Sequence, residues 1–286
     1  MRPVRFGVVG LGRFGEMHCD ALAGMPQAEL FALCTRTESR LLEFAARYNV
    51  SRAYTDYREM FADPDLEAVS VVTMWDQHTA PAVAALQAGK HIFIEKPMAS
   101  TIADCEAIIA AANRAGTFAM AGHICRFNPR YASAKREIES GALGRIVSIY
   151  ARRNIPAAVS EKVLPKIGPI AGDGVHDTDL MLWFTGARID ERMEIVGTEG
   201  SMHIQDGAPN FSVCDKDGWR APDTTYWPLL HGERAGALRE ELTYFAGCIR
   251  ENRKPSVVTL EDAMAAVRGC LAAEESAATG SVVRLV

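Results

Sequence analysis

The sequence has no long hydrophobic run, no block of basic residues and no closely spaced pair of cysteines. No stretch approaches the roughly 20 apolar residues that a membrane-spanning helix needs, so we expect no membrane partner. The net charge of −5, without a basic patch, argues against nucleic acid as a partner. The first residues show no cleavable signal pattern, and we therefore expect a cytoplasmic protein.

The seven cysteines are scattered along the chain, and no two of them have a C-x-x-C spacing. An odd number of widely spaced cysteines is typical of buried or free thiols in a reducing compartment. We expect no disulfides and no structural zinc, and the sequence predicts no metal site.

Strand and helix patterns alternate through the first half of this 286-residue chain. The length favours two domains. The β-α-β alternation predicts an α/β fold with a doubly wound parallel (Rossmann) sheet and right-handed crossovers. The expected strands are 4–10, 28–34, 68–73, 90–94 and 118–122, and the expected helices are 14–25, 57–61, 77–88 and 101–115.

A G-x-G-x-x-G motif directly follows the first expected strand and opens the first expected helix. In that context it predicts a dinucleotide-binding turn, with Arg13 and Phe14 inside it. Gly10 allows the tight turn, Gly12 lets the backbone approach the pyrophosphate, and Gly15 lets helix and strand pack closely. The helix N-terminus then faces the phosphates.

The second expected strand ends in Thr35 and Arg36, where an enzyme that uses NAD usually carries Asp or Glu. The missing carboxylate and the adjacent arginine favour NADP over NAD, because a guanidinium suits a 2′-phosphate. The alternative is that Arg36 only begins the next helix in solvent. Both cofactors therefore stay open.

Three further candidate cofactor contacts, Thr73, Trp75 and His78, lie at or after the carboxyl end of the strand 68–73. Trp75 could stack near the nicotinamide ribose or cover an edge of the core, and we leave both open. His78 begins the next helix and is more typical of a structural cap than of a catalyst.

Glu95, Lys96 and Pro97 directly follow the buried strand that ends at Ile94. Proline lacks an N–H and fixes φ, so it stops the strand and holds the lysine at the carboxyl end. Ligands bind at that end of an open parallel sheet, and this aims Lys96 at the chemistry. The alternative is a solvated pair of surface charges.

Several co-linear motifs together resemble the Gfo/Idh/MocA family of oxidoreductases, which includes glucose–fructose oxidoreductase and the inositol dehydrogenases. The resemblance implies an NAD(P)-binding Rossmann domain at 1–122 and, at 123–286, an α+β substrate domain with an open mixed sheet. It also implies a small-molecule substrate and a homo-oligomer. The matching stretches are 4–15, 77–78, 88–91, 95–97, 126–131, 141–146 and 174–180.

The resemblance implies that Lys96 and His176 are catalytic and that Glu95 helps to position the lysine or the cofactor ribose. Histidine suits removal of a hydroxyl proton at neutral pH, and an ammonium stabilises developing alkoxide character. The family commonly places an aspartate four residues before the histidine, but this chain has Gly172 there. Asp173 is offset by three residues, so it could orient His176 or point elsewhere.

A second departure is the loss of several strands that the family normally carries after residue 189. We therefore expect a smaller second sheet, and the loss puts the oligomer interface in doubt. The expected elements of this half are helices 129–140, 174–184, 235–251 and 260–278, strands 146–153 and 282–286, a hairpin of 193–197 with 201–205, and a strand at 211–214.

The sequence as a whole predicts an NAD(P)-dependent oxidoreductase that acts on CH–OH groups of a sugar, a polyol or a related hydroxy or keto compound. The alternative is a sensory or scaffolding member of the same family that binds the nucleotide without turnover. The shortened second domain and the displaced aspartate favour the alternative, whereas the presence of both Lys96 and His176 favours the enzyme.

Overall fold

The computed structural model describes residues 2–151, 170–186, 196–197, 213–215, 218–220 and 224–284 of the chain. The first 122 residues contain a six-stranded sheet in the order β3-β2-β1-β4-β5-β6, and every neighbouring pair is parallel. This confirms the predicted doubly wound sheet. The strands are β1 (Val4–Val9), β2 (Ala28–Cys34), β3 (Arg52–Tyr54), β4 (Ala68–Val71), β5 (His91–Glu95) and β6 (Ala119–Gly122).

The central strands are apolar because both faces of the sheet are covered. All four residues of β4 are buried, and four of the five in β5 are. The edge strand β3 was missed by the sequence analysis, because its three residues are only half-buried and form no apolar run.

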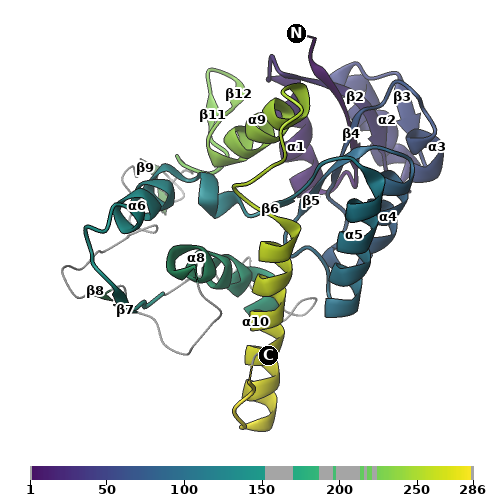
Figure 1. Cartoon of the computed structure of the whole chain (residues 1–286). Helices are drawn as coiled ribbons and strands as arrows, with labels where there is room; N and C mark the ends of the chain where they lie inside the picture. The colour runs from purple at the N-terminus through teal and green to yellow at the C-terminus, as the bar shows by residue number, and fades with distance from the viewer. Residues whose placement is uncertain are drawn as a thin grey trace.

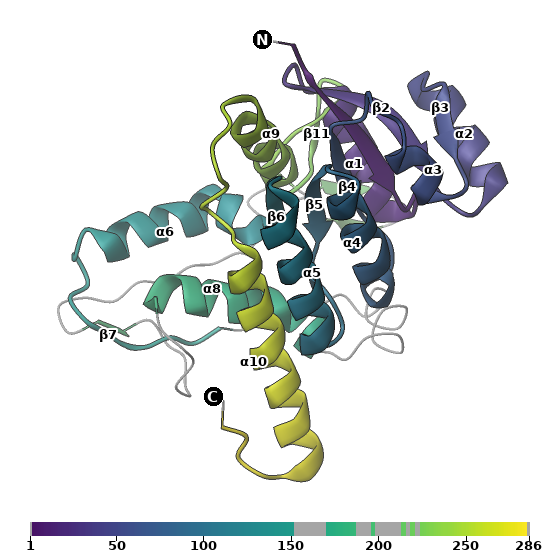
Figure 2. The same cartoon turned by 45° about the vertical axis from the view of Figure 1, so that its right-hand side comes forward.

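Helices cover both faces of the sheet (Figures 1 and 2). Helices α1, α2 and α9 lie together on one face, and α3, α4 and α5 cover the other. Helix α9 comes from near the C-terminal end of the sequence, so a late segment completes the helical layer on this face of the sheet. These helices are α1 (Arg13–Ala23), α2 (Glu38–Tyr48), α3 (Tyr57–Phe61), α4 (Thr79–Gln87), α5 (Ile102–Ala115) and α9 (Ala237–Arg250).

The second half begins with a 3₁₀ turn, η2 (Ile124–Phe127), directly after β6. Helix α8 (Val175–Thr185) packs across α10 (Leu260–Thr279), and α10 also contacts α5 (Figures 1 and 2). A capping box of Thr259 and Asp262 fixes the start of α10. The other elements are α6 (Pro129–Glu139), β7 (Ile146–Ser148), β8 (Val196–Gly197), β9 (Val213–Asp215), β10 (Gly218–Arg220), β11 (Leu229–Leu230) and β12 (Glu233–Arg234).

The small strands of this half differ in part from the prediction. Strand β7 covers only the first part of the expected 146–153 and pairs antiparallel with β8. The expected final strand is wrong over 282–284, where the backbone is irregular, Val282 is 76% exposed and no strand within the described ranges pairs with the segment. The hairpin expected at 193–205 lies outside the described residues, apart from β8.

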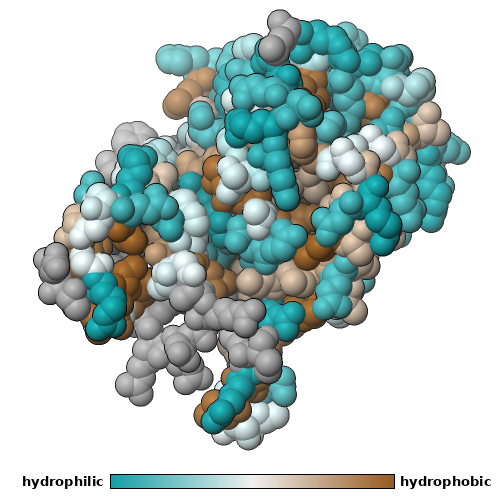
Figure 3. All heavy atoms as spheres, viewed as in Figure 1, coloured by the Kyte–Doolittle hydropathy of each residue, from teal (hydrophilic) through white to brown (hydrophobic). Residues whose placement is uncertain are grey.

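Hydrophilic side chains dominate the surface over the sheet half, whereas hydrophobic ones gather near α6 and β7 (Figure 3). Val147 and Tyr150 are the large exposed apolar residues there, at 57% and 64% exposure. Within the described ranges, no helix combines the length and apolar character needed to cross a membrane. The division at residue 122 and the homo-oligomer remain predictions.

Candidate active site

The three glycines of the fingerprint turn have different surroundings. Gly10 has φ +98°, and a Cβ there would lie 2.5 Å from the Val72 carbonyl oxygen. A Cβ on Gly15 would lie 2.0 Å from the Gly10 carbonyl oxygen, so strand and helix could not approach. Gly12 has nothing within 4 Å of a Cβ, and it precedes α1 without a side-chain cap. The turn is therefore closely packed at Gly10 and Gly15 and open at Gly12.

The other fingerprint residues lie at the surface of the first turn of α1. Arg13 is exposed, and Phe14 is 38% exposed. The ring of Phe14 meets Trp227 edge to face, with 5.6 Å between centroids. A segment more than 200 residues later thus covers part of the turn. No spacing rule in the sequence could have indicated Trp227.

Arg36 links the two loops that flank the open Gly12 turn. It is exposed, and one guanidinium nitrogen donates to the Gln77 side-chain oxygen at 3.0 Å. Thr35 is half-buried at the end of β2. The guanidinium is available near the place where a cofactor ribose is expected, but an amide already engages it.

His78 is almost fully buried, at 1% exposure, and caps no helix with its side chain. Its Nε2 lies 3.0 Å from the Thr73 carbonyl oxygen, and its Nδ1 lies 3.1 Å from the Pro97 carbonyl oxygen. Burial lowers the pKa of His78, and the two carbonyls only partly offset this. The ring ties the end of β4 to the turn after Lys96, which is a structural task.

Trp75 lies against a small hydrophobic cluster beyond the sheet. Its half-buried side chain packs against a cluster formed by Ala171 just before α8, Val175 at its start, and Ala266 and Cys270 of α10. These contacts agree with the covering of a core edge, and a contact of Trp75 with the cofactor stays a prediction.

Glu95 ends β5 inside a buried network of hydrogen bonds. Its Oε1 lies 3.1 Å from His18 Nε2, and its Oε2 accepts the backbone N–H of Lys96 at 3.1 Å. Ser70 Oγ is 2.8 Å from the other ring nitrogen of His18. Burial alone would raise the pKa of Glu95, but His18 and Lys96 outweigh it and hold the pKa below its ordinary value. The Glu95 carboxylate therefore fixes the backbone of Lys96 by accepting its N–H.

The Lys96 ammonium reaches the other half of the chain. Lys96 Nζ donates to the Gly172 carbonyl oxygen at 3.0 Å and to Asp173 Oδ1 at 3.4 Å. Asp173 Oδ1 lies 4.0 Å from His176 Nε2. Pro97 follows in a cis peptide bond. The structure thus brings Lys96 to Asp173 and His176, which lie about 80 positions later in the sequence.

A π-helical turn, η3 (Ile170–Gly174), leads without a break into α8 and determines this geometry. The segment is helical in spite of its glycines, so an offset of three residues keeps Asp173 and His176 on one face. Such wider turns are frequent at functional sites. The displaced aspartate therefore faces both Lys96 and His176.

A buried ion pair beside this cluster was missed by the sequence analysis. Arg126 of η2 donates to both carboxylate oxygens of Asp179, at 2.9 and 2.6 Å, and to Asp262 at 3.1 Å. His123 is fully buried, with Nδ1 3.6 Å from Asp179. The sequence could have indicated Asp179 as a neighbour of the site, because it lies one turn after the candidate His176 on α8.

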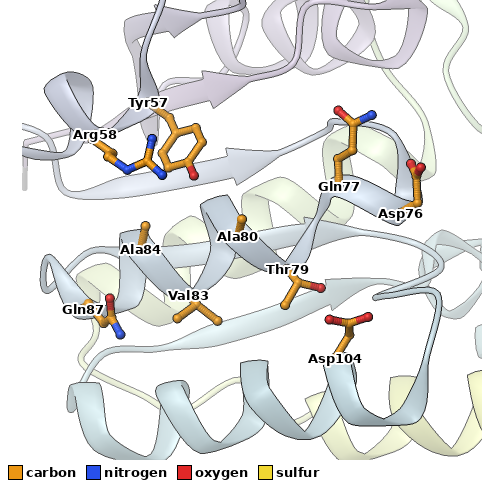
Figure 4. Close-up of a pocket in the computed structure, with 10 residues that line it drawn as sticks. All are labelled: Tyr57, Arg58, Asp76, Gln77, Thr79, Ala80, Val83, Ala84, Gln87 and Asp104. Carbon is orange, nitrogen blue, oxygen red and sulfur yellow. The ribbon is translucent and has the colours of Figure 1, made fainter.

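The hollow in Figure 4 lies away from these groups, on the outer face of α4. It has a volume of about 590 Å³, and its walls come from α3, α4, α5 and the turn before α4. None of Lys96, Asp173 or His176 lines it. Its lining includes Gln77, the hydrogen-bond partner of Arg36, but none of the groups that we place at the reaction. We therefore do not place the chemistry there.

Comparison with known proteins agrees with this arrangement. Residues 4–123 match the family model described as the Gfo/Idh/MocA oxidoreductase family with an NAD-binding Rossmann fold. The inositol 2-dehydrogenase of Acidothermus cellulolyticus is 34% identical over 198 residues, which cover 68% of this chain and 58% of that protein. The chain belongs to the Gfo/Idh/MocA family.

The full length of the chain aligns with more distant members of the Gfo/Idh/MocA family. The scyllo-inositol 2-dehydrogenase (NAD(+)) of Bacillus subtilis is 26% identical over 332 aligned positions, covering 99% of this chain and 96% of that protein. Because this chain has 286 residues, the alignment contains positions where the relative carries extra residues. The shortened second half that we predicted agrees with that difference in length.

A solved structure shows the same fold over nearly the whole chain. The apo scyllo-inositol dehydrogenase of Lactobacillus casei superposes with a TM-score of 0.79 at 23% identity and covers 96% of both chains. By contrast, the chain spans only 60% and 58% of the length of the first curated relatives it matches.

Proposed function

We propose that this chain is an NAD(H)-dependent dehydrogenase that transfers a hydride between nicotinamide and a CH–OH carbon of inositol or a related polyol. The observation that carries the proposal is the convergence of Lys96 and His176 around Asp173 at the carboxyl end of β5. The names of the relatives, inositol 2-dehydrogenase and scyllo-inositol 2-dehydrogenase, support a cyclic polyol as substrate.

The fingerprint turn has the features that a dinucleotide needs. The backbone at Gly12 is open to an approaching group, and the start of α1 has no side-chain cap to compete for its N–H groups. Gly12 and the first residues of α1 would hold the pyrophosphate. Thr73 follows β4 and Glu95 ends β5, so both lie between the fingerprint turn and the proposed position of the nicotinamide. When bound, the cofactor accepts or supplies the hydride.

The side chains of the cluster can manage the proton and the charge of the substrate oxygen. His176 Nε2 lies 4.0 Å from Asp173 Oδ1, and it would take the hydroxyl proton as the C–O bond becomes a carbonyl. The Lys96 ammonium would stabilise negative charge on that oxygen. Asp173 would orient both groups and favour the imidazolium that forms. In the reverse direction, His176 returns the proton.

We propose NAD(H) as the cofactor, although Arg36 and the missing carboxylate predicted a preference for NADP. The matched family model is described as NAD-binding, and the Bacillus subtilis relative is named for NAD(+). The preference for NADP finds no support in these relatives. The hydrogen bond from Arg36 to Gln77 agrees with this, because that guanidinium already has a neutral partner.

The proposal is tested with the purified chain, NAD or NADP, and a panel of inositol isomers, open-chain polyols, aldoses and 2-hydroxy acids. We expect nicotinamide reduction, followed by absorbance, to be fastest with an inositol and NAD. Activity confined to hydroxy acids would refute the substrate class. Tight NAD binding in calorimetry without turnover on any substrate would favour a non-catalytic member of the family.

A further inference from the structure

Glu241 of α9 is a buried carboxyl group that the proposed reaction does not use. The residue has no exposure, and neither carboxyl oxygen has a hydrogen-bond partner within the part of the chain that the structure describes. An ionised carboxylate without partners is very costly in such a place. Neutral glutamic acid, in contrast, needs only one acceptor for its hydroxyl.

Aromatic contacts show that the faces carrying Glu241 and Glu95 meet between α9 and β5. Phe245 lies one turn after Glu241 on α9, and its ring meets Phe93 of β5 with 6.1 Å between centroids. Residues four apart share a helix face, and residues two apart share a strand face. Glu241 and Glu95 therefore face the same apolar space, and the charge of Glu95 acts on Glu241. Phe6 closes the same apolar space, 6.3 Å from Phe245.

The charged groups on the neighbouring elements decide which carboxyl carries the negative charge. Glu95 has His18 and the Lys96 N–H as donors, and these hold its pKa low. Burial, and to a smaller degree the charge of Glu95, raises the pKa of Glu241 well above its ordinary range. The proton therefore belongs on Glu241.

Among the described residues, the arginines of two further elements packed against α9 have carboxylate partners of their own. Arg126 of η2 pairs with Asp179 and Asp262. Arg5 of β1 pairs with Asp65 and Glu67.

We propose that Glu241 is a protonated carboxylic acid whose hydroxyl faces Glu95 and, with His18, fixes that carboxylate as the acceptor of the Lys96 N–H. Glu241 is then a positioning residue for Lys96, and it acts through Glu95 rather than on the substrate. Its protonation is independent of the proposed function, whereas its effect on turnover rests on it.

The protonation is tested by infrared difference spectroscopy of the full chain at neutral pH. We expect the carbonyl band of a protonated acid in the wild type and its loss in Glu241→Gln. Glu240→Gln is the matched control, because Glu240 is the exposed neighbour on the same helix. Wild-type and Glu241→Gln spectra that agree in this band would overturn the proposal.

Stability against pH gives a second readout that needs no activity. An acid whose pKa is raised by folding stabilises the folded state below the unfolded pKa of about 4.3, and this contribution is lost as pH rises toward the folded value. The urea midpoint of Glu241→Gln should therefore rise relative to that of wild type between about pH 5 and pH 8. Glu240→Gln should keep a constant difference from wild type. A constant difference for Glu241→Gln as well would count against a raised pKa.

The positioning role is tested by turnover. Glutamine keeps a donor toward Glu95, whereas leucine removes it. We expect Glu241→Gln to keep kcat within about twofold, and Glu241→Leu to lose about tenfold or more with KM for NAD unchanged. Equal loss in both variants, or none in the leucine variant, would refute this role. An inactive wild type would refute the proposed function, and the infrared result would still decide the protonation.

Discussion

Two regions supply the groups that meet at the candidate site, and the fold holds them in different ways. Lys96 follows β5, which is paired with β4 on one side and β6 on the other. His176 approaches from α8, whose place depends on packing across α10 and on the buried Arg126–Asp179 pair. The lysine is fixed by the register of a sheet, whereas the histidine is fixed by a few contacts between distant segments. The histidine side should therefore be the easier one to displace.

The largest effect is expected from Asp179→Ala, which removes the carboxylate that holds α8 to η2. The change leaves the Arg126 guanidinium buried with the half-exposed Asp262 as its remaining carboxylate partner in the described ranges, beside the Val257 carbonyl oxygen. Breaking such a pair costs about 3–5 kcal/mol. Urea unfolding should show this loss, and hydrogen exchange should quicken in α8 before it changes in β5.

Asp177→Ala is the matched control for that experiment, because it removes a carboxylate from the first turn of the same helix. That variant should lose the helix-dipole contribution of about 0.3–1 kcal/mol while leaving the Arg126–Asp179 pair in place. Equal destabilisation by the two variants would show that the Arg126 pair does not hold the histidine side.

Lys96→Met should leave the sheet intact and remove the only ammonium that we place at the substrate oxygen. The loss of such an electrostatic group typically costs about 10²–10³ in kcat. Steady-state kinetics with the best polyol should show this loss, and the dissociation constant for NAD should change little. Turnover close to that of wild type would remove Lys96 from the mechanism.

The sheet half and its fingerprint could be predicted from local patterns, because a strand, a glycine turn and a helix follow each other within a few residues. The edge strand β3 escaped because three half-buried residues carry no periodicity. His176 was found only through the resemblance, since nothing near it in the sequence marks a catalyst. Networks such as Arg126 with Asp179, or Glu95 with Glu241, join residues more than 50 positions apart. Their partners depend on packing that no single stretch of sequence encodes.

A pair of alanine substitutions sharpens the description of the lysine side. Gly15→Ala places a Cβ 2.0 Å from the Gly10 carbonyl oxygen, and the resulting overpacking should cost about 1–3 kcal/mol of stability or more. Gly12→Ala meets nothing within 4 Å, so the fold should keep its stability. NAD affinity should nevertheless fall by about tenfold, which corresponds to about 1.4 kcal/mol. Calorimetry and thermal unfolding of both variants separate the two effects, and an unchanged affinity in Gly12→Ala would place the pyrophosphate elsewhere.

The smallest effect is expected from Asp173→Asn, at the point where the two regions touch. Asp173 is about a third exposed, so its ion pair with Lys96 adds only about 0–1 kcal/mol to stability. Its task in the proposed reaction is orientation of Lys96 and His176, and its loss should lower kcat by about tenfold. Asp177→Asn, at the start of the same helix, leaves the Asp173 carboxylate in place and should keep kcat near that of wild type. If Asp173→Asn keeps the wild-type rate, the contact between the two regions serves folding alone, and the histidine side must be oriented from α8 itself.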